Sequence, residues 1–199
     1  MNSNIEFHST FSSPRQSSSE LGLCSRLTEN VYLSPHFELR EFTGSATARK
    51  YGIVNEPPAE AVENLKALCV HTLEPLREAL GLPIVITSGY RCKALNDKIG
   101  HHSDRSQHMS GCAADFHVWQ AQVSGVKFQV SSSDRRELLI KAFRQILTDP
   151  KISFDQVIIY PSFIHVSYVS NGKNRRKITK GYGNGKYCAL TRDEALSLI

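Results

Sequence analysis

The chain has 199 residues, of which 40% are hydrophobic and 22% are charged, and 24 Lys and Arg against 19 Asp and Glu give a net charge of +5. This composition is typical of a globular chain and excludes a wholly disordered one. No apolar run approaches the roughly 20 residues of a transmembrane helix, so we expect no membrane span. The positive charge is compatible with nucleic acid, anionic lipid or an anionic cell-wall polymer, and alone it favours none of them.

The N-terminal region has the composition of a tail. Residues 1–30 contain no basic segment followed by an apolar one, so the sequence shows no secretory signal and we expect synthesis in the cytoplasm. The Ser-rich stretch 9–19 predicts a mobile tail over residues 1–30, followed by a single domain over residues 31–199. The cysteines form no CxxC pair, which favours free thiols over a disulfide framework or a structural zinc site: Cys24, Cys69, Cys92, Cys112 and Cys188.

Helix and strand signals alternate in the first half of the domain. Residues 33–42 predict a short strand or turn at the domain edge. A helix is expected from residue 57 to about residue 80, because apolar residues recur there at helical spacing. Pro75 predicts a kink or an interruption in the last turns of this helix. The β-branched run 84–87 predicts a strand that ends in a turn.

The second half adds further strands and one long helix. Residues 91–110 are polar and predict a long functional loop with one helical turn, followed by a strand over residues 113–118. Residues 131–147 predict a helix with one apolar face. The mostly apolar run 154–169, divided by a central Pro-Ser pair, predicts an antiparallel hairpin. This irregular order predicts an α+β fold, a small antiparallel sheet with flanking helices.

Three features indicate chemistry. His108 and Asp115 flank Gly111, and His165 lies on an otherwise apolar predicted strand. Two neutral imidazoles and one carboxylate are the protein ligands of a catalytic zinc, with a fourth position left for water. Arg91 follows a strand end and is suited to clamp a carboxylate or to stabilise an oxyanion. Each feature alone also fits a structural role: a hydrogen-bonded strand histidine, a His–Asp pair, or a surface arginine in a salt bridge.

The motifs resemble those of a known family. The segment SQHMSGCAAD (residues 106–115) matches the S-x-H-x-x-G-x-A-x-D signature of zinc D-alanyl-D-alanine carboxypeptidases and L-alanyl-D-glutamate endopeptidases, which cut peptidoglycan stem peptides. The segment SGYR (residues 88–91) resembles the substrate-binding arginine motif of that family. FDQVI (residues 154–158) and IHVS (residues 164–167) are similar to its final strand pair. The resemblance spans about residues 32–170.

The resemblance implies a hedgehog/D-Ala-D-Ala peptidase-like fold and metal-assisted amide hydrolysis. It also implies one Zn²⁺ per chain, held by three ligands: His108, Asp115 and His165. Arg91 would hold the substrate or the oxyanion, and Ser106 would orient a ligand or the substrate. Tyr90 and Tyr160 are candidates for contacting the substrate and its oxyanion, or are simply packed.

The sequence departs from the family pattern where a general base is needed. Relatives often carry a carboxylate shortly before the last metal histidine, but the segment Gln156–Ile164 contains no Asp or Glu. Asp155 is one candidate for the base, although it precedes His165 by ten residues. His117 is another, because an extended strand places it on the same face as Asp115; a packed strand histidine is the alternative. The pair His101-His102 is either solvated or close to the zinc.

The leading hypothesis is a zinc peptidase that acts on peptidoglycan peptides, as a carboxypeptidase or an endopeptidase. The alternative is a non-catalytic zinc-binding module that recognises wall peptides or a protein partner. We expect a monomer with no specific nucleic-acid partner. A phage or mobile-element lysin, released to the wall by another protein, would explain the missing signal.

The positive charge is concentrated near the C-terminus. Residues 156–192 contain seven of the 24 basic residues and no acidic one, and five of the seven lie between Lys173 and Lys180. This run predicts either a solvated turn or a basic rim beside the zinc that attracts the anionic wall.

Overall fold

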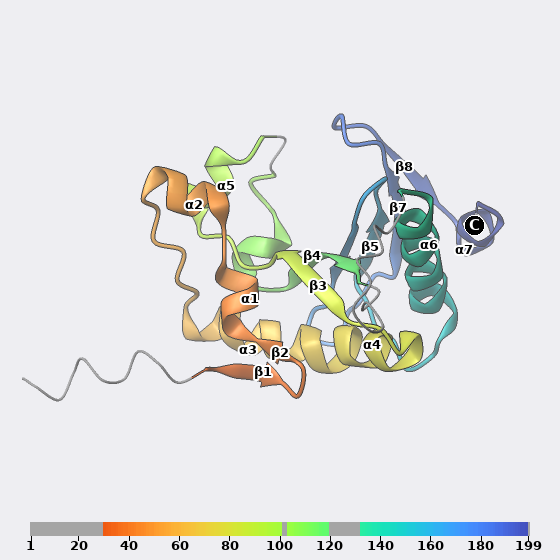
Figure 1. Cartoon of the computed structure of the whole chain (residues 1–199), viewed down its shortest axis with the longest axis horizontal. Helices are drawn as coiled ribbons and strands as arrows, with labels where there is room; N and C mark the ends of the chain where they lie inside the picture. Colours follow the sequence, from red (N-terminus) through yellow and green to blue (C-terminus); the bar gives the residue numbers. More distant parts are fainter. Residues whose placement is uncertain (1–29, 101–102, 120–131, 199) are drawn as a thin grey trace, which may run out of the picture.

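The computed structural model describes residues 30–100, 103–119 and 132–198 and has an α+β fold, as the sequence predicts. The predicted tail therefore lies almost wholly outside the described residues, as does the pair His101-His102. A six-stranded sheet packs one apolar face against helices to form the core, and a small antiparallel pair, β1 (Tyr32–Ser34) with β2 (Phe37–Glu38), lies near its edge (Figure 1).

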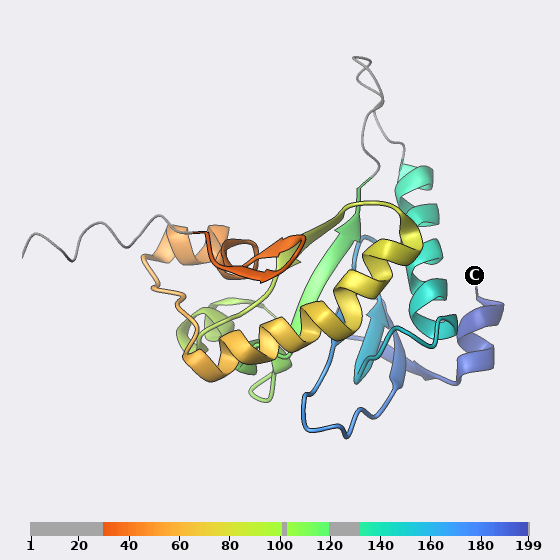
Figure 2. The ribbon, with the colours of Figure 1, turned by 90° about the horizontal axis from the view of Figure 1, so that it is seen from below.

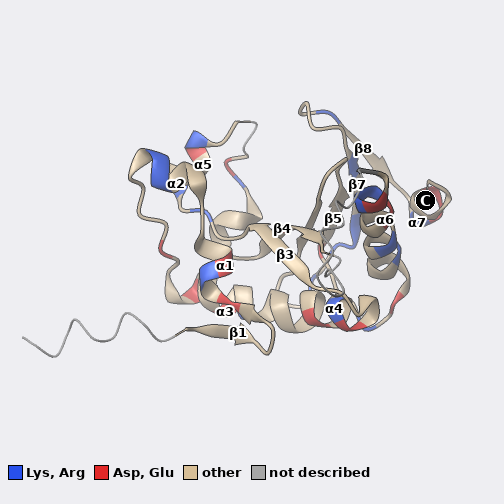
Figure 3. Ribbon diagram, viewed as in Figure 1, with Lys and Arg blue, Asp and Glu red and all other residues tan. Residues whose placement is uncertain are grey.

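The large sheet is mixed. Its spatial order is β3 (Ile84–Ser88), β4 (Ala113–Val118), β6 (Ile164–Ser167), β5 (Gln156–Ile159), β7 (Lys177–Gly181) and β8 (Tyr187–Leu190). Neighbouring strands are antiparallel, including the predicted β5–β6 hairpin, except that β5 and β7 run parallel. Only the second part of the basic run, from Lys177 to Lys180, lies in strand β7 beside the hairpin, and the first part precedes that strand; Figure 3 shows Lys and Arg near β7.

Helices cover one face of this sheet. The long helical segment α3 (Ala59–Leu68), η1 (Cys69–Leu73) and α4 (Glu74–Leu80) crosses the sheet, and α6 (Ser132–Thr148) packs beside it (Figure 2). Shorter helices flank these layers: α1 (Leu39–Thr43), α2 (Ala46–Tyr51), α5 (Lys93–Lys98) and α7 (Arg192–Ser197). None of the described helices is long and apolar enough to span a membrane.

The proline in the long helix is accommodated by a π turn. Pro75 has no N–H to donate to the carbonyl of His71, four residues earlier. The turn η1 widens the helix there, with the Glu74 N–H donating to the Cys69 carbonyl, and the orphaned His71 carbonyl accepts from Ser153 N at 3.0 Å. The helix therefore continues past Pro75. The carbonyl that the proline leaves without a helical partner is hydrogen-bonded to the segment before β5.

Side chains along the central strands point alternately to the two faces of the sheet, one of which is the core and the other of which carries polar groups. Phe116 on β4, Ile164 on β6 and Val157 on β5 are fully buried among the helices. Their neighbours Asp115 and His165 lie on the opposite face, because successive side chains of a strand point to opposite sides. The sequence thus places one apolar face in the core and leaves the other face for a site.

Candidate metal centre and cleft

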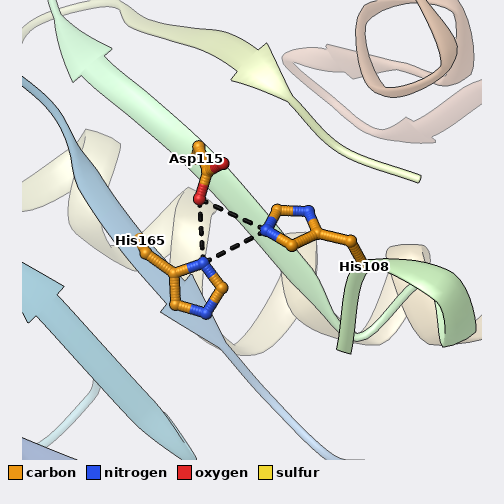
Figure 4. A group of neighbouring side chains, drawn as sticks. All are labelled: His108, Asp115 and His165. Carbon is orange, nitrogen blue, oxygen red and sulfur yellow. Dashed lines mark hydrogen bonds and ion pairs between the residues drawn. The ribbon is translucent and has the colours of Figure 1, made fainter. Parts of the chain in front are cut away.

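Three side chains far apart in the sequence converge on the open face of the sheet (Figure 4). His165 Nδ1 lies 2.8 Å from Asp115 Oδ1, and His108 Nε2 lies 3.2 Å from His165 Nδ1 and 3.3 Å from the same carboxylate oxygen. One ligand atom from each residue lies within 4.8 Å of the others. The three predicted metal ligands are therefore brought together.

Strand register and one glycine account for this convergence. Asp115 on β4 and His165 on β6 are direct partners in the antiparallel ladder. His108 comes from the 3₁₀ turn η2 (Gln107–Ser110), which ends at Gly111 with φ of +73°. A Cβ at Gly111 would collide with the carbonyl of Ala61, so glycine is needed there both for the left-handed turn and for the close approach to α3.

The hydrogen bonding and burial of His108 suit it to bind a metal. His108 Nδ1 donates to the Gly89 carbonyl at 2.7 Å, which directs Nε2 toward Asp115 and His165. Burial lowers the pKa of His108, so the imidazole is held in its neutral, ligating form. Two imidazole nitrogens and one carboxylate oxygen are a donor set that zinc accepts. The residues present therefore fit a three-ligand metal centre.

Asp115 is ionised despite its burial. Burial raises its pKa, but the two neighbouring histidines outweigh this effect and hold the pKa well below its ordinary value. Arg91 Nη2 donates to the second oxygen, Asp115 Oδ2, at 2.9 Å. Arg91 Nε in turn donates to Ser88 Oγ at 3.0 Å, which fixes the guanidinium plane beside the three ligands. The predicted substrate arginine therefore also orients Asp115, a candidate metal ligand.

The centre lies in an open cleft of about 760 Å³. Its floor is the polar face of β4, β6 and β5, including Asp115, His165 and Ile158. The predicted Ser106 lines it, as do Tyr160 and Phe163 beyond the end of β5. A cleft of this size and openness accommodates several residues of an extended peptide.

Asp155 lines the same cleft, but it is held in a separate cluster. The carboxylate is only 2% exposed, accepts from the Arg175 guanidinium and backbone N–H, and accepts from Gln107 Nε2 at 2.9 Å. Burial raises its pKa, yet the hydrogen bonds from Arg175 prevail and lower the pKa to about 2. Asp155 thus stands as an ionised, fully engaged carboxylate beside the turn that carries His108.

Two other predicted residues lie outside the described cleft lining. His117 is half-buried on β4, opposite Val85, with its ring 6.5 Å from that of Trp119, and burial lowers its pKa. Tyr90 is only 7% exposed and packs in the core.

The sequence did not single out Gln107 and Tyr187 as site residues, and it placed Arg175 only within the basic run; all three line the cleft. Gln107 stands inside the signature segment at a variable position, which is a weak signal. Arg175 and Tyr187 reach the cleft only through the unpredicted pairing of β7 and β8 with the hairpin.

Comparison with known families matches residues 35–147 to the model described as Peptidase M15, more than half of the chain. The chain belongs to the peptidase M15 family. The matched range includes Arg91, His108 and Asp115, whereas His165 follows it and joins them through the β4–β6 pairing. No curated protein is similar enough to this chain to count as a match. Membership identifies the fold group and implies a metallopeptidase that acts on peptide substrates.

Proposed function

We propose that this M15 chain is a zinc peptidase that hydrolyses peptide bonds in peptidoglycan stem peptides. The observation that carries the proposal is the convergence of His108, Asp115 and His165 on the floor of an open cleft, with Arg91 beside them. The family match supports peptide hydrolysis, and the sequence resemblance to wall-cutting enzymes supports the substrate class.

One Zn²⁺ held by the three ligands would act as a Lewis acid and lower the pKa of a bound water to about 7. Arg91 keeps the Asp115 carboxylate in place, and its Nη1 has no partner among the described residues, so it can donate to the carbonyl oxygen of the scissile bond. Ser106 lines the cleft as a further donor to the peptide, and the Tyr160 hydroxyl, which donates its proton to Tyr187, is an acceptor there. These groups bind and orient the substrate.

The proton-transfer group is proposed among the two residues that the sequence indicated. Asp155 is ionised and lies in the cleft, but it becomes a base only if substrate displaces Arg175 from it. His117 lies two residues along β4 from Asp115, on the same face. Comparison of Asp155→Asn with His117→Gln by single-turnover cleavage assigns the role: the base variant loses about 100-fold or more in rate, with peptide binding retained.

A second function is favoured by one specific observation. The two carboxylates that line the described cleft, Asp115 and Asp155, are both already paired with arginines. A zinc-binding module that recognises wall peptides without cutting them would need no free base. Binding of muropeptides by the zinc-loaded chain without any turnover would select this function.

The test of the first function is release of free amines from purified peptidoglycan. We expect release by the zinc-loaded chain, its loss with excess EDTA and its recovery when zinc is restored. His108→Ala should abolish release, whereas His36→Ala, which removes a histidine outside the cleft, should retain it. Continued digestion by His108→Ala would refute the proposal.

A further inference from the structure

The strand register divides the cleft into two ends, with His165 between them. In the β5–β6 hairpin, Ile158 is the partner of His165, and Gln156 is the partner of Ser167. At about 3.3 Å per residue, Asp155 lies roughly 10 Å along β5 from the position opposite His165. Tyr160 lies roughly 7 Å away in the other direction. The two ends can therefore contact different parts of one extended peptide.

At one end, the described residues that line the cleft are aromatic or glycine and carry no charge. The Tyr160 ring stacks on Phe163 with centroids 4.3 Å apart, and the Tyr160 hydroxyl donates to the Tyr187 hydroxyl at 3.2 Å. Gly181 lies beside Tyr160, and a Cβ there would collide with the ring. The missing side chain lets the two tyrosines meet across β7, with Tyr187 53% exposed at the rim. This end presents ring faces and hydroxyls.

The other end is cationic. Arg175 and Gln107 contact each other and share Asp155 as their acceptor. Arg105 precedes Gln107 by two residues and Lys173 precedes Arg175 by two, so both cations lie around the Asp155 cluster. Both line the cleft and both are exposed. Within the described residues, neither the Arg105 guanidinium nor the Lys173 ammonium forms an ion pair.

The charges of the cleft do not cancel. Asp115 is neutralised by Arg91 and Asp155 by Arg175. Asp115 and Asp155 are the acidic residues of the cleft lining in the part of the chain that the structure describes. Arg105 and Lys173 therefore leave an excess of positive charge at the Asp155 end. An exposed ammonium or guanidinium in a concave site favours a carboxylate through charge-assisted hydrogen bonds.

We propose that the cleft selects an acidic peptide and holds it in one orientation. A substrate carboxylate lies on Arg105 and Lys173, about three residues from the bond above the metal centre, and an uncharged segment lies over Tyr160 and Tyr187. The carboxylate therefore belongs on one side of the scissile bond only. This substrate class deepens the proposed peptidase function, and the reaction part of it rests on that function.

The test separates binding from cleavage. The probes are fluorescein-labelled Ala/Gly octapeptides, each with a single Glu placed at a different position, and each has a counterpart with Gln at that position. Fluorescence anisotropy measures their affinity for the EDTA-treated full chain. We expect the Glu peptides to bind tighter by about 2- to 5-fold for each of the two cations, more weakly at high salt. On the zinc-loaded chain, cleavage should occur about three residues from Glu, always on the same side.

The variants assign the preference to the cationic end. Arg105→Gln/Lys173→Gln should abolish the preference for Glu over Gln, whereas Arg49→Gln/Lys151→Gln removes the same charge from exposed positions outside the cleft and should retain it. An equal loss in both double variants would show nonspecific attraction and overturn the proposal. So would cleavage at both sides of Glu, or equal binding of the Glu and Gln peptides by the unmodified chain.

The outcomes distinguish this proposal from the peptidase function. If no peptide is cut but Glu binding depends on Arg105 and Lys173, peptidase activity fails and the acidic-peptide preference stands. If wall peptides are cut with no dependence on the two cations, the acidic-peptide preference fails and the peptidase stands.

Discussion

Replacement of Arg175 by Gln is expected to destabilise the protein through Asp155. The Asp155 carboxylate is 2% exposed and accepts hydrogen bonds from both Nε and Nη2 of the Arg175 side chain. Without the guanidinium, the buried negative charge keeps two donors among the described residues, the residue 175 N–H at 2.9 Å and Gln107 Nε2 at 2.9 Å. An ionised group left without its counter-charge is costly to bury.

The magnitude follows from the pKa. A pKa near 2 in the folded chain, against the ordinary value of 3.8, corresponds to at most about 2.5 kcal/mol of stability at neutral pH. Removing one partner of a fully buried pair costs about 3–5 kcal/mol, but the Arg175 side chain is 57% exposed, so water screens the interaction. We therefore expect Arg175→Gln to lower the free energy of unfolding by about 1–2 kcal/mol.

The assay is urea unfolding at pH 7, followed by circular dichroism. Lys177→Gln is the matched control, because it removes one positive charge from an exposed side chain on the adjoining strand, and it should change the free energy of unfolding by less than about 0.5 kcal/mol. The double variant Arg175→Gln/Asp155→Asn should recover part of the loss, since the buried charge is then gone.

The pH dependence supplies a second check. The folded pKa of Asp155 is depressed, so its contribution to stability is present above about pH 4 and is lost as pH falls toward about 2. The difference between the unmodified chain and Arg175→Gln should shrink over that range. A difference that stays constant from pH 7 to 2.5, or a double variant as unstable as the sum of its parts, would refute the assigned role of the ion pair.

Further predictions concern the metal and two glycines. Zinc at about 100 times its dissociation constant should stabilise the chain by about 2.7 kcal/mol, seen as a higher Tm that EDTA reverses, and His165→Ala should remove the shift. Gly111→Ala should cost about 2–4 kcal/mol in urea unfolding, because it combines a positive φ with a collision at the Ala61 carbonyl; a loss under 1 kcal/mol would contradict this. Gly181→Ala should displace the Tyr160 ring and cost about 1–3 kcal/mol, and an unchanged Tm would show that the ring is not fixed there.

The local elements of the fold were predictable where the sequence has a clear period. Apolar residues at helical spacing predicted the α3–α4 segment, and the run around His165 predicted the β5–β6 hairpin. The π turn was not predicted, because its stability depends on Ser153 N, which comes from a distant part of the chain. Strand β7 was missed because Lys177 and Lys180 gave it the composition of a solvated turn, and only its pairing with β5 makes it a strand.

In the candidate site too, the residue types were predictable from the sequence, whereas contacts that depend on strand pairing were not. His108, Asp115 and His165 could be named from the residue types and the signature, but their separation of only a few ångströms depends on the β4–β6 register, where a slip of one residue would turn His165 into the core. The Asp155–Arg175 pair was not predictable, because it links residues that meet only through the parallel β5–β7 pairing. The basic run near Lys173 was predicted as a turn or a rim, and part of it does line the cleft.

Mass spectrometry of muropeptides tests the central claim most directly. Purified peptidoglycan is incubated with the zinc-loaded chain and with His165→Ala under the same conditions, and the products are assigned to individual bonds. The proposed function predicts new stem-peptide fragments from one type of bond with the unmodified chain and none with the variant. An unchanged muropeptide profile with a chain that demonstrably holds one zinc, or identical fragments from His165→Ala, would contradict it.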